Sequence, residues 1–409
     1  MFSALKFVAA GAIVALFGGF LLAGVLTAPQ EGEVHPAAVT ESPMPMTTEE
    51  LLSGMVTEEV EPGVYRVIHD GVRDLAYSEH NFRVDVTPDG SVWLSGIGDG
   101  QDLFRLGEER VFEGRMGYPP WWQVAPEGSL WSIDGRGIFS FDGEGWTVRA
   151  TTTTDRLSAL AVGPDGTVWV MGDDWDRHCH DIEDDDCSGA VLLRLEDDGS
   201  LTTIEDWADV HDGDAWLRSL AVSPDGDVWL VGRGGETKDG TELAGALLRF
   251  DGEGWEAIPG PEGWAPERPW LASGPDGTLW VDASRRVGDA NRGELAQYDD
   301  LARYDDAGWT TFTDADGVEP WHDPSGYWGP MMPPTVAADG SLWLERFEGY
   351  DCGGAAHYDG TTWTSYLVGH CISDLAIAPD GSVWLGAEDG DTNRSSLYVI
   401  TPEAVAASE

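Results

Sequence analysis

Basic residues are scarce in this chain of 409 residues. Lysine and arginine together number 23, against 74 aspartates and glutamates, which gives a formal charge of −51 at pH 7. Only Lys6 and Lys238 are lysines. Because a surface this acidic repels phosphate backbones, DNA and RNA are excluded as a partner class. Adaptation to high salt and a GC-rich genome would each explain the shortage of lysine, and neither identifies a reaction.

The common catalytic and cofactor motifs are also missing. The chain has no Gly-x-Ser-x-Gly, no His-Glu-x-x-His and no phosphate-binding loop, and its nine histidines keep no fixed place in the repeat described below. We therefore expect no catalytic residue and no organic cofactor. Hydrophobic residues make up 42% of the chain, which is enough for a folded core and argues against global disorder.

The N-terminus contains one long apolar run. Residues 7–28 carry no charge, and at about 1.5 Å per residue a helix of this length crosses the roughly 30 Å hydrocarbon core of a bilayer. Lys6 precedes the run and Glu31 follows it, which favours an inside N-terminus. We expect residues 1–28 to be a single-pass anchor with the rest of the chain on the extracytoplasmic side. The alternative is a cleaved signal peptide and a secreted protein.

Two short segments flank the main body of the chain. Residues 29–60 are rich in Pro, Thr and Glu and are predicted to be a flexible acidic linker, with a short helix after Thr47 as its N-cap. Residues 404–409 are predicted to be a tail. The body between them, residues 61–403, forms one repetitive domain.

The body repeats one unit seven times. Each unit has an apolar segment, a tight turn, and then Val or Leu followed by Trp. Proline presets the first turn position and glycine supplies a positive φ, so each copy predicts a β-hairpin. The turns are Pro88-Asp89-Gly90, Pro126-Glu127-Gly128, Pro164-Asp165-Gly166, Pro224-Asp225-Gly226, Pro275-Asp276-Gly277, Ala338-Asp339-Gly340 and Pro379-Asp380-Gly381.

A second hairpin follows in most units. The segment 141–146, which ends in Trp146, is matched at 250–255, 304–309 and 358–363. Each unit is therefore four strands, named A to D, and seven such units predict an all-β, seven-bladed β-propeller. The last unit ends after its third strand. We expect residues 64–68 to supply the missing strand beside residues 397–400, which closes the ring.

By these turns and tryptophans, residues 64–400 resemble the bacterial propeller repeats of periplasmic sensor regions in two-component regulators. The resemblance to streptogramin-lyase and WD-repeat propellers is looser. These resemblances imply the fold of the chain far more strongly than they imply an activity. Two other propeller classes differ from this chain, since sialidase Asp-boxes place one residue between Asp and Gly, and quinone-dependent dehydrogenases carry a longer Trp motif.

Nine of the twenty tryptophans lie outside the two hairpin motifs, in or beside the longer B–C connections within blades and D–A connections between blades. Strand parity sends these connections to the end of the propeller opposite the tight turns. Aromatic side chains there predict either caps over the core or a binding face for a carbohydrate or a basic peptide or protein. The best candidate anchors are Trp121, Trp122, Trp264, Trp270, Trp321 and Trp328.

The four cysteines predict disulfides, because an even number in an exported chain favours pairing. The first pair, Cys179 with Cys187, lies in one insertion, and the second, Cys352 with Cys371, joins two loops at the same end of the propeller. A Ca²⁺ site is a further hypothesis. The spacing of Asp389, Asp391 and Asn393 matches the start of a calcium loop without its later glutamate.

These observations predict a monomeric, membrane-anchored extracellular propeller that binds a ligand or partner without catalysis. The starts of strand A are mostly apolar, as at Leu160, Leu220 and Leu271, which argues against a catalytic centre there. Two alternatives stay open: a lyase or metal-dependent hydrolase with its site at the central channel, and a structural envelope protein.

Overall fold

The computed structural model describes part of the chain, and every structural statement below refers to that part: residues 45–68, 82–96, 101–107, 110–114, 121–143, 145–154, 156–173, 190–204, 216–233, 235–236, 242–243, 245–261, 264, 270–282, 285–287, 296–298, 301–313, 334–348, 351–389 and 394–408. None of the helices in these ranges is long and apolar enough to cross a membrane. The predicted anchor at residues 1–28 lies outside them.

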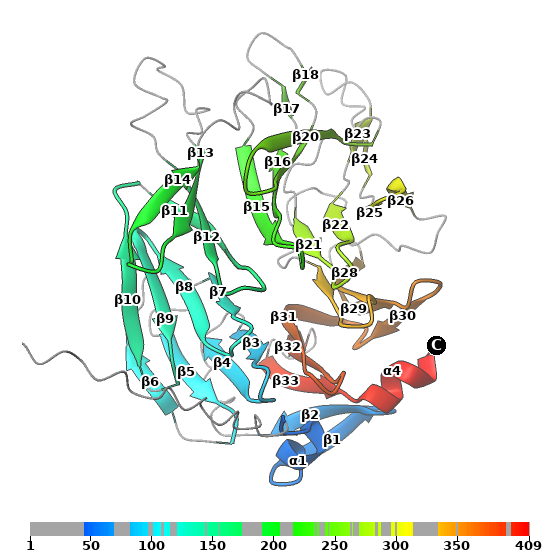
Figure 1. Cartoon of the computed structure of the whole chain (residues 1–409). Coiled ribbons are helices and arrows are strands. Elements are labelled where there is room, and N and C mark those ends of the chain that lie inside the picture. Colours follow the sequence, from blue (N-terminus) through cyan, green and yellow to red (C-terminus); the bar gives the residue numbers. More distant parts are fainter. Residues whose placement is uncertain are drawn as a thin grey trace, which may run out of the picture. The chain divides into compact units, whose positions relative to one another are not determined.

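Seven antiparallel sheets form a seven-bladed β-propeller, as predicted (Figure 1). Within each blade the strands run in sequence from the innermost, A, to the outermost, D. Blade 1 consists of β3 (Phe82–Val86), β4 (Val92–Gly96), β5 (Gln101–Arg105) and β6 (Arg110–Gly114). Blade 2 consists of β7 (Trp121–Val124), β8 (Leu130–Asp134), β9 (Gly137–Phe141) and β10 (Trp146–Thr151). Blade 3 consists of β11 (Arg156–Val162), β12 (Val168–Asp173), β13 (Ala190–Leu195) and β14 (Leu201–Ile204).

Blades 4 to 6 follow the same order. Blade 4 consists of β15 (Trp216–Val222), β16 (Val228–Arg233), β19 (Ala246–Phe250) and β20 (Trp255–Pro259). Blade 5 consists of β21 (Leu271–Ser273), β22 (Leu279–Asp282), β25 (Leu301–Asp305) and β26 (Gly308–Phe312). Blade 6 consists of β27 (Thr335–Val336), β28 (Leu342–Glu348), β29 (Asp351–Tyr358) and β30 (Trp363–Tyr366). Two small hairpins, β17 (Gly235–Glu236) with β18 (Glu242–Leu243) and β23 (Arg285–Val287) with β24 (Ala296–Tyr298), lie in the B–C connections of blades 4 and 5.

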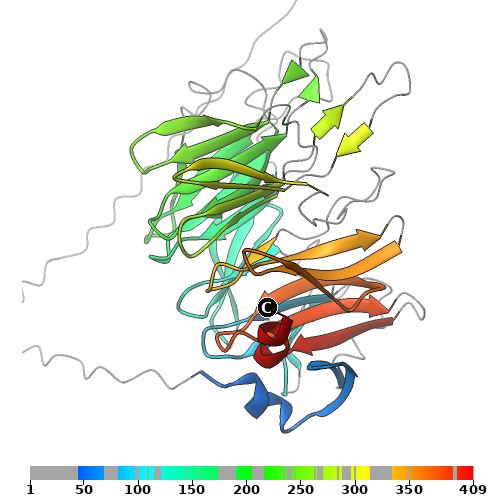
Figure 2. The same ribbon diagram turned by 90° about the vertical axis from the view of Figure 1, so that its right-hand side faces the viewer.

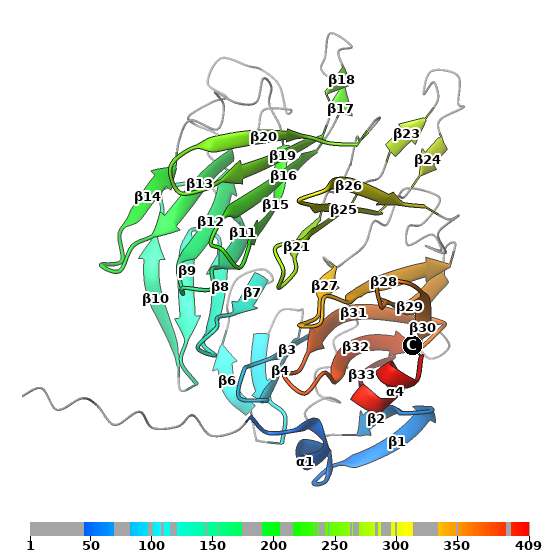
Figure 3. The same ribbon diagram turned by 45° about the vertical axis from the view of Figure 1, so that its right-hand side comes forward.

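Blade 7 joins the two ends of the propeller. Its strands β31 (His370–Ile377), β32 (Val383–Asp389) and β33 (Arg394–Ile400) are followed in space by β2 (Val64–Ile68), with Val64 opposite Ile400. Figures 2 and 3 show the blue N-terminal strands beside the red C-terminal ones. The predicted closure by residues 64–68 is confirmed. The innermost strands also contact one another in turn around the ring, from β31 through β3, β7, β11, β15, β21 and β27 back to β31.

Residues 45–61, the N-terminal strap, are more ordered than the linker predicted over 29–60. β1 (Val56–Glu61) adds a fifth strand outside β2, and α1 (Thr48–Leu52) begins at Thr47, which forms a capping box with Glu50 and confirms Thr47 as the N-cap. The N–H of Thr48 donates a 2.6 Å hydrogen bond to Asp380 in the A–B turn of blade 7. At the other end, α4 (Pro402–Ser408) begins before the predicted tail and includes most of it.

The tight turns define one end of the propeller, which we name the turn face; the opposite end is the loop face. In each A–B turn the glycine N–H bonds the carbonyl three residues earlier, as Gly166 does to Gly163 at 2.9 Å. Gly90 has a second constraint besides its φ of 82°, because a Cβ there would lie 2.1 Å from the carbonyl oxygen of Met46 in the strap.

Tryptophans of strand B fill the spaces between blades. All seven are buried, and several meet an aromatic ring on strand C of the next blade: Trp93 meets Phe141 with centroids 5.4 Å apart, and Trp229 meets Tyr304 at 6.0 Å. The repeated motif is thus an interblade packing device. The seven side chains are Trp93, Trp131, Trp169, Trp229, Trp280, Trp343 and Trp384.

Candidate functional site

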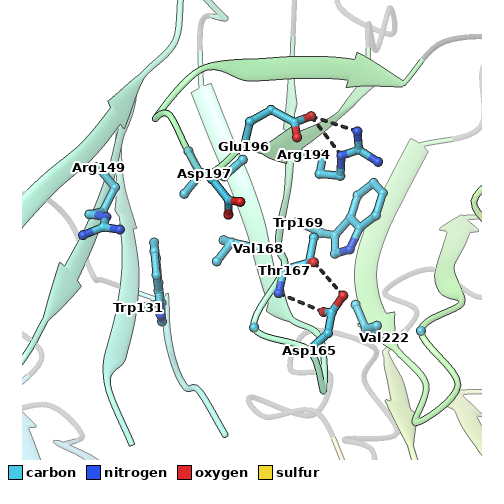
Figure 4. A pocket seen from close by; sticks show the side chains of 13 residues that line it. Trp131, Arg149, Asp165, Thr167, Val168, Trp169, Arg194, Glu196, Asp197 and Val222 are labelled. Carbon is cyan, nitrogen blue, oxygen red and sulfur yellow. Dashed lines mark hydrogen bonds and ion pairs between the residues drawn. The ribbon is translucent and has the colours of Figure 1, made fainter. Parts of the chain in front are cut away.

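A pocket of about 430 Å³ opens on the turn face between blades 2, 3 and 4 (Figure 4). Trp131 and Arg149 of blade 2 form one wall, and the A–B and C–D turns of blade 3 form the other. The pocket is lined mainly by polar groups, which a hydroxyl-rich ligand can satisfy. Its lining residues are Trp131, Arg149, Asp165, Gly166, Thr167, Val168, Trp169, Arg194, Leu195, Glu196, Asp197, Val222 and Gly226.

The A–B turn of blade 3 holds Asp165 in a fixed position. Its carboxylate accepts two 2.9 Å hydrogen bonds from Thr167, one from the backbone N–H and one from the hydroxyl. Because these bonds favour the charged form, the pKa of Asp165 lies below its ordinary value. The turn that shapes the pocket therefore also presents an ionised carboxylate whose geometry is set by the backbone.

Arg194 and Glu196 form a second preorganised group in the pocket. The Arg194 guanidinium lies 5.9 Å from the ring centre of Trp169 and donates a 2.9 Å hydrogen bond to Glu196. The Thr202 hydroxyl, followed by Arg194, lowers the pKa of Glu196. Arg194 thus has a carboxylate partner within its own blade.

Arg149 occupies the opposite wall. Its guanidinium lies 5.5 Å from the ring centre of Trp131, whose indole N–H donates a 3.0 Å hydrogen bond to Ser129. The residue is exposed and forms no ion pair with any residue that the structure describes. Asp197, on the C–D turn of blade 3, likewise has no ion-pair partner among the described residues.

A second polar group lies at the innermost strands of blades 7 and 1. Asp374 accepts a 2.9 Å hydrogen bond from the N–H of Val84, on the free inner edge of β3. Burial raises the pKa of Asp374, opposed by the charge of Arg83. Burial, followed by the charge of Asp374, raises the pKa of Asp85 well above its ordinary value. Two carboxyl groups of unusual basicity therefore lie near the centre of the ring.

The six predicted binding tryptophans divide into three groups. Trp122 and Trp264 are 5% and 3% exposed and belong to core clusters, so both side chains pack in the interior. Trp264 lies against Trp309 with ring centres 5.6 Å apart. Trp270 is half-buried at the start of blade 5. Trp321, Trp328 and the side chain of Trp121 lie outside the described residues.

The predicted Cys352–Cys371 disulfide is present and ties β29 of blade 6 to β31 of blade 7. Cys179 and Cys187 lie outside the described residues. Of the candidate calcium ligands, Asp389 is the last residue of β32. Asp391 and Asn393 lie outside the described residues. Within the described ranges no three His, Cys, Asp or Glu side chains are grouped as metal ligands would be.

Neither the pocket nor the Asp85–Asp374 pair was predicted from the sequence. For Asp85 a signal was present: counted from the A–B turn, the same position in strand A is Ala161, Ala221, Ala272 and Ala376 in four other blades. A carboxylate at a position where four other blades have alanine indicates a role other than packing between strands. No comparable signal exists for Arg149, because its position depends on a change of strand register.

No protein-family model matches this sequence, and a search of curated proteins finds no match. Several solved structures share this fold at low sequence identity. The extracellular domain of a candidate hybrid two-component system from B. thetaiotaomicron is 14% identical, with a TM-score of 0.50, over 80% of this chain and 39% of that one. The corresponding domain of a candidate one-component system from the same organism has a TM-score of 0.51 and 12% identity, over 79% of this chain and 40% of that one.

Hydrazine synthase from Kuenenia stuttgartiensis has a TM-score of 0.51 and 14% identity, over 78% of this chain and 94% of that one. This chain spans about two fifths of the length of the two B. thetaiotaomicron proteins. At such identities the likeness concerns the fold, which bacterial sensors and an enzyme share. The chain is therefore a seven-bladed β-propeller similar in fold to the extracellular domains of candidate one- and two-component systems of B. thetaiotaomicron.

Proposed function

We propose that this protein is an extracytoplasmic, membrane-anchored β-propeller that binds a carbohydrate in the pocket on the turn face and does not transform it. The observation that carries this proposal is the pocket itself, a hollow between blades 2, 3 and 4 whose ionised side chains are held by turns and neighbouring strands. Preorganised polar groups of this kind bind hydroxyl-rich ligands at little entropic cost.

The charges of the pocket favour a carbohydrate over a basic peptide. Arg149 lines it without a carboxylate partner among the described residues, and a cationic ligand would meet this guanidinium at close range. Hydroxyl groups can donate to Asp165, Glu196 and Asp197 and can accept from the arginines. A sugar therefore uses both signs of charge in the pocket, whereas a basic peptide uses only one.

Three features support an extracytoplasmic location. Residues 7–28 have the length and composition of a membrane anchor. The Cys352–Cys371 disulfide is typical of an oxidising compartment. Two proteins of similar fold are described as extracellular domains. A secreted form after signal cleavage would place the pocket in the same compartment.

An array of oligosaccharides and basic peptides, probed with the full-length chain in detergent, tests this proposal. We expect saccharides to be retained and peptides not. Replacing Glu196→Gln and Asp197→Asn together should abolish retention, while Asp306→Asn, in the C–D turn of blade 5, should not. Retention of basic peptides alone, or binding that survives the double substitution, would contradict the proposed site.

Asp85 and Asp374 favour a second candidate function, catalysis at the centre of the ring. A carboxyl group with a raised pKa can serve as a general acid beside an ionised neighbour. Incubating the full-length chain with the retained saccharides and analysing them by mass spectrometry separates the two functions. Unchanged saccharides support binding alone; products that disappear with Asp374→Asn would support an enzyme.

A further inference from the structure

Arg149 departs from a pattern that three other blades share. In blades 1, 3 and 4 the guanidinium near the strand-B tryptophan comes from the facing residue of strand C, as in the pairs Trp93 with Arg105, Trp169 with Arg194, and Trp229 with Arg249. In blade 2 the residue facing Trp131 is Ser140, and the guanidinium comes from Arg149 on strand D.

A β-bulge allows Arg149 of strand D to stack on Trp131, as arginines of strand C do in the other three blades. Val148 faces Phe139 and Ala150 faces Ile138, so Arg149 between them has no partner in β9. A bulge bends its strand and redirects the extra side chain, and bulges are common beside binding sites. The bulged residue also packs closely on blade 3, because a Cβ on Gly199 would lie 3.1 Å from the carbonyl oxygen of Arg149.

The other stacked arginines are neutralised within their own blades. Arg105 donates to Ser91 at 3.1 Å and lies 3.7 Å from Asp89, and Arg194 bonds Glu196 at 2.9 Å. Arg249 donates a 2.6 Å hydrogen bond to Asp227. Arg149 has no such carboxylate among the described residues, although it lies in a pocket of a chain with a formal charge of −51. A negatively charged group on a bound ligand can therefore pair with the Arg149 guanidinium.

We infer that the ligand of the pocket is an acidic sugar, one that carries a carboxylate or sulfate group which Arg149 binds. This inference rests on the proposed carbohydrate function and adds the charge class. The planar guanidinium matches either group through paired N–H donors. Asp197, on the facing wall, accepts from a ring hydroxyl and disfavours a second acidic group. A neutral sugar would leave Arg149 without a counter-charge.

Three glucosides that differ at carbon 6 test the inference: β-linked oligomers that carry a carboxylate (glucuronate), a 6-sulfate or an unmodified hydroxymethyl group. Titration calorimetry with the full-length chain should show the carboxylate or the sulfate form binding at least about tenfold more tightly than the neutral one, since charge-assisted hydrogen bonds exceed neutral ones by this order. Arg149→Gln should remove the preference, and Arg149→Lys should restore part of it.

Arg105→Gln is the matched control, because it removes a stacked arginine from a blade that does not line the pocket. It should keep the preference, and thermal unfolding should confirm that both glutamine variants fold. Equal affinity for all three oligomers, or a preference that survives Arg149→Gln, would overturn the inference and leave carbohydrate binding in place. No binding of these oligomers or of any saccharide on the array would overturn both proposals.

Discussion

Asp374 of blade 7 accepts a 2.9 Å hydrogen bond from the backbone N–H of Val84 in blade 1, although the two residues are 290 positions apart. The same role falls to neutral side chains at two other seams, where Gln123 accepts from the N–H of Val162 and Ser219 from that of Leu271. The inner edge of strand A is thus bridged from the preceding blade. At the seam that closes the ring, the bridging group can titrate.

We expect the stability of the ring to fall as pH rises because of Asp85 and Asp374. Both carboxyl groups have raised pKa values in the folded protein, so the folded chain binds their protons more tightly than the unfolded one. Their stabilising contribution is fully present below the unfolded pKa of about 4 and is lost as pH rises through the folded values.

Asp85→Asn should therefore stabilise the protein at pH 7, by about 1 kcal/mol for each unit of raised pKa, and flatten the dependence above pH 4. Urea unfolding between pH 4 and pH 8 measures the effect, with exposed Asp306→Asn as control. A variant less stable than the wild type at pH 7 would contradict the prediction.

Breaking the pairing of β2 should weaken the closure of the propeller. In β2, Tyr65 lies between Glu59 of β1 and Val399 of β33, so Tyr65→Pro removes a hydrogen-bond donor from a central strand and should lower the free energy of unfolding by about 1–3 kcal/mol. Val60→Pro, at the bulge of the edge strand β1, should cost much less. Thermal unfolding and limited proteolysis compare the two. Equal losses would argue that β2 and β1 contribute alike.

The Cys352–Cys371 disulfide should stabilise the junction of blades 6 and 7. It closes a segment with a sequence separation of 19, for which the usual contribution is about 2–4 kcal/mol. Replacing both cysteines by alanine should lower the free energy of unfolding by this amount. Thiol titration of the denatured, unreduced protein should find almost no free thiols; four reactive thiols would exclude both predicted bridges.

Trp122→Ala should destabilise the fold without changing ligand binding by the folded protein. Its side chain is 5% exposed and packs in a cluster with Trp93, Leu130 and Phe141, so truncation leaves a cavity that costs about 3–5 kcal/mol. Val148→Ala, at a side chain that is 58% exposed in the same blade, should change stability little. If the folded variant no longer bound saccharide, the result would contradict this prediction and support Trp122 as a ligand-binding residue.

The blades could be predicted because their determinants are local. A proline, an aspartate and a glycine in succession specify a turn whatever surrounds them, and seven copies specify the number of blades. The aspartates keep this role in the structure: hydrogen bonds within the turn lower the pKa of Asp165 and Asp339 despite partial burial, and at Asp380 the N–H of Thr48 in the strap lowers the pKa together with the turn's own Ser382. The closing strand could be predicted by counting, since the last unit lacked one.

The sites were predicted less well because their determinants are not local. Trp122 and Trp264 have the residue type and loop position of a binding surface, but burial depends on which neighbouring blade covers them. β1 carries too many glutamates to be recognised as a strand; it forms on the free edge of β2, where its side chains face solvent.

The sequence by itself therefore determined an acidic, all-β ring of seven blades, its closure by residues 64–68 and the pairing of Cys352 with Cys371, because turns, strand counts and parity are properties of short segments. Only the tertiary structure decided where charges meet. Arg149 reaches the pocket because a bulge shifts its register, and Asp85 meets Asp374 because closing the ring brings the first blade against the last. Both arrangements depend on contacts between residues far apart in the chain, which no local pattern encodes.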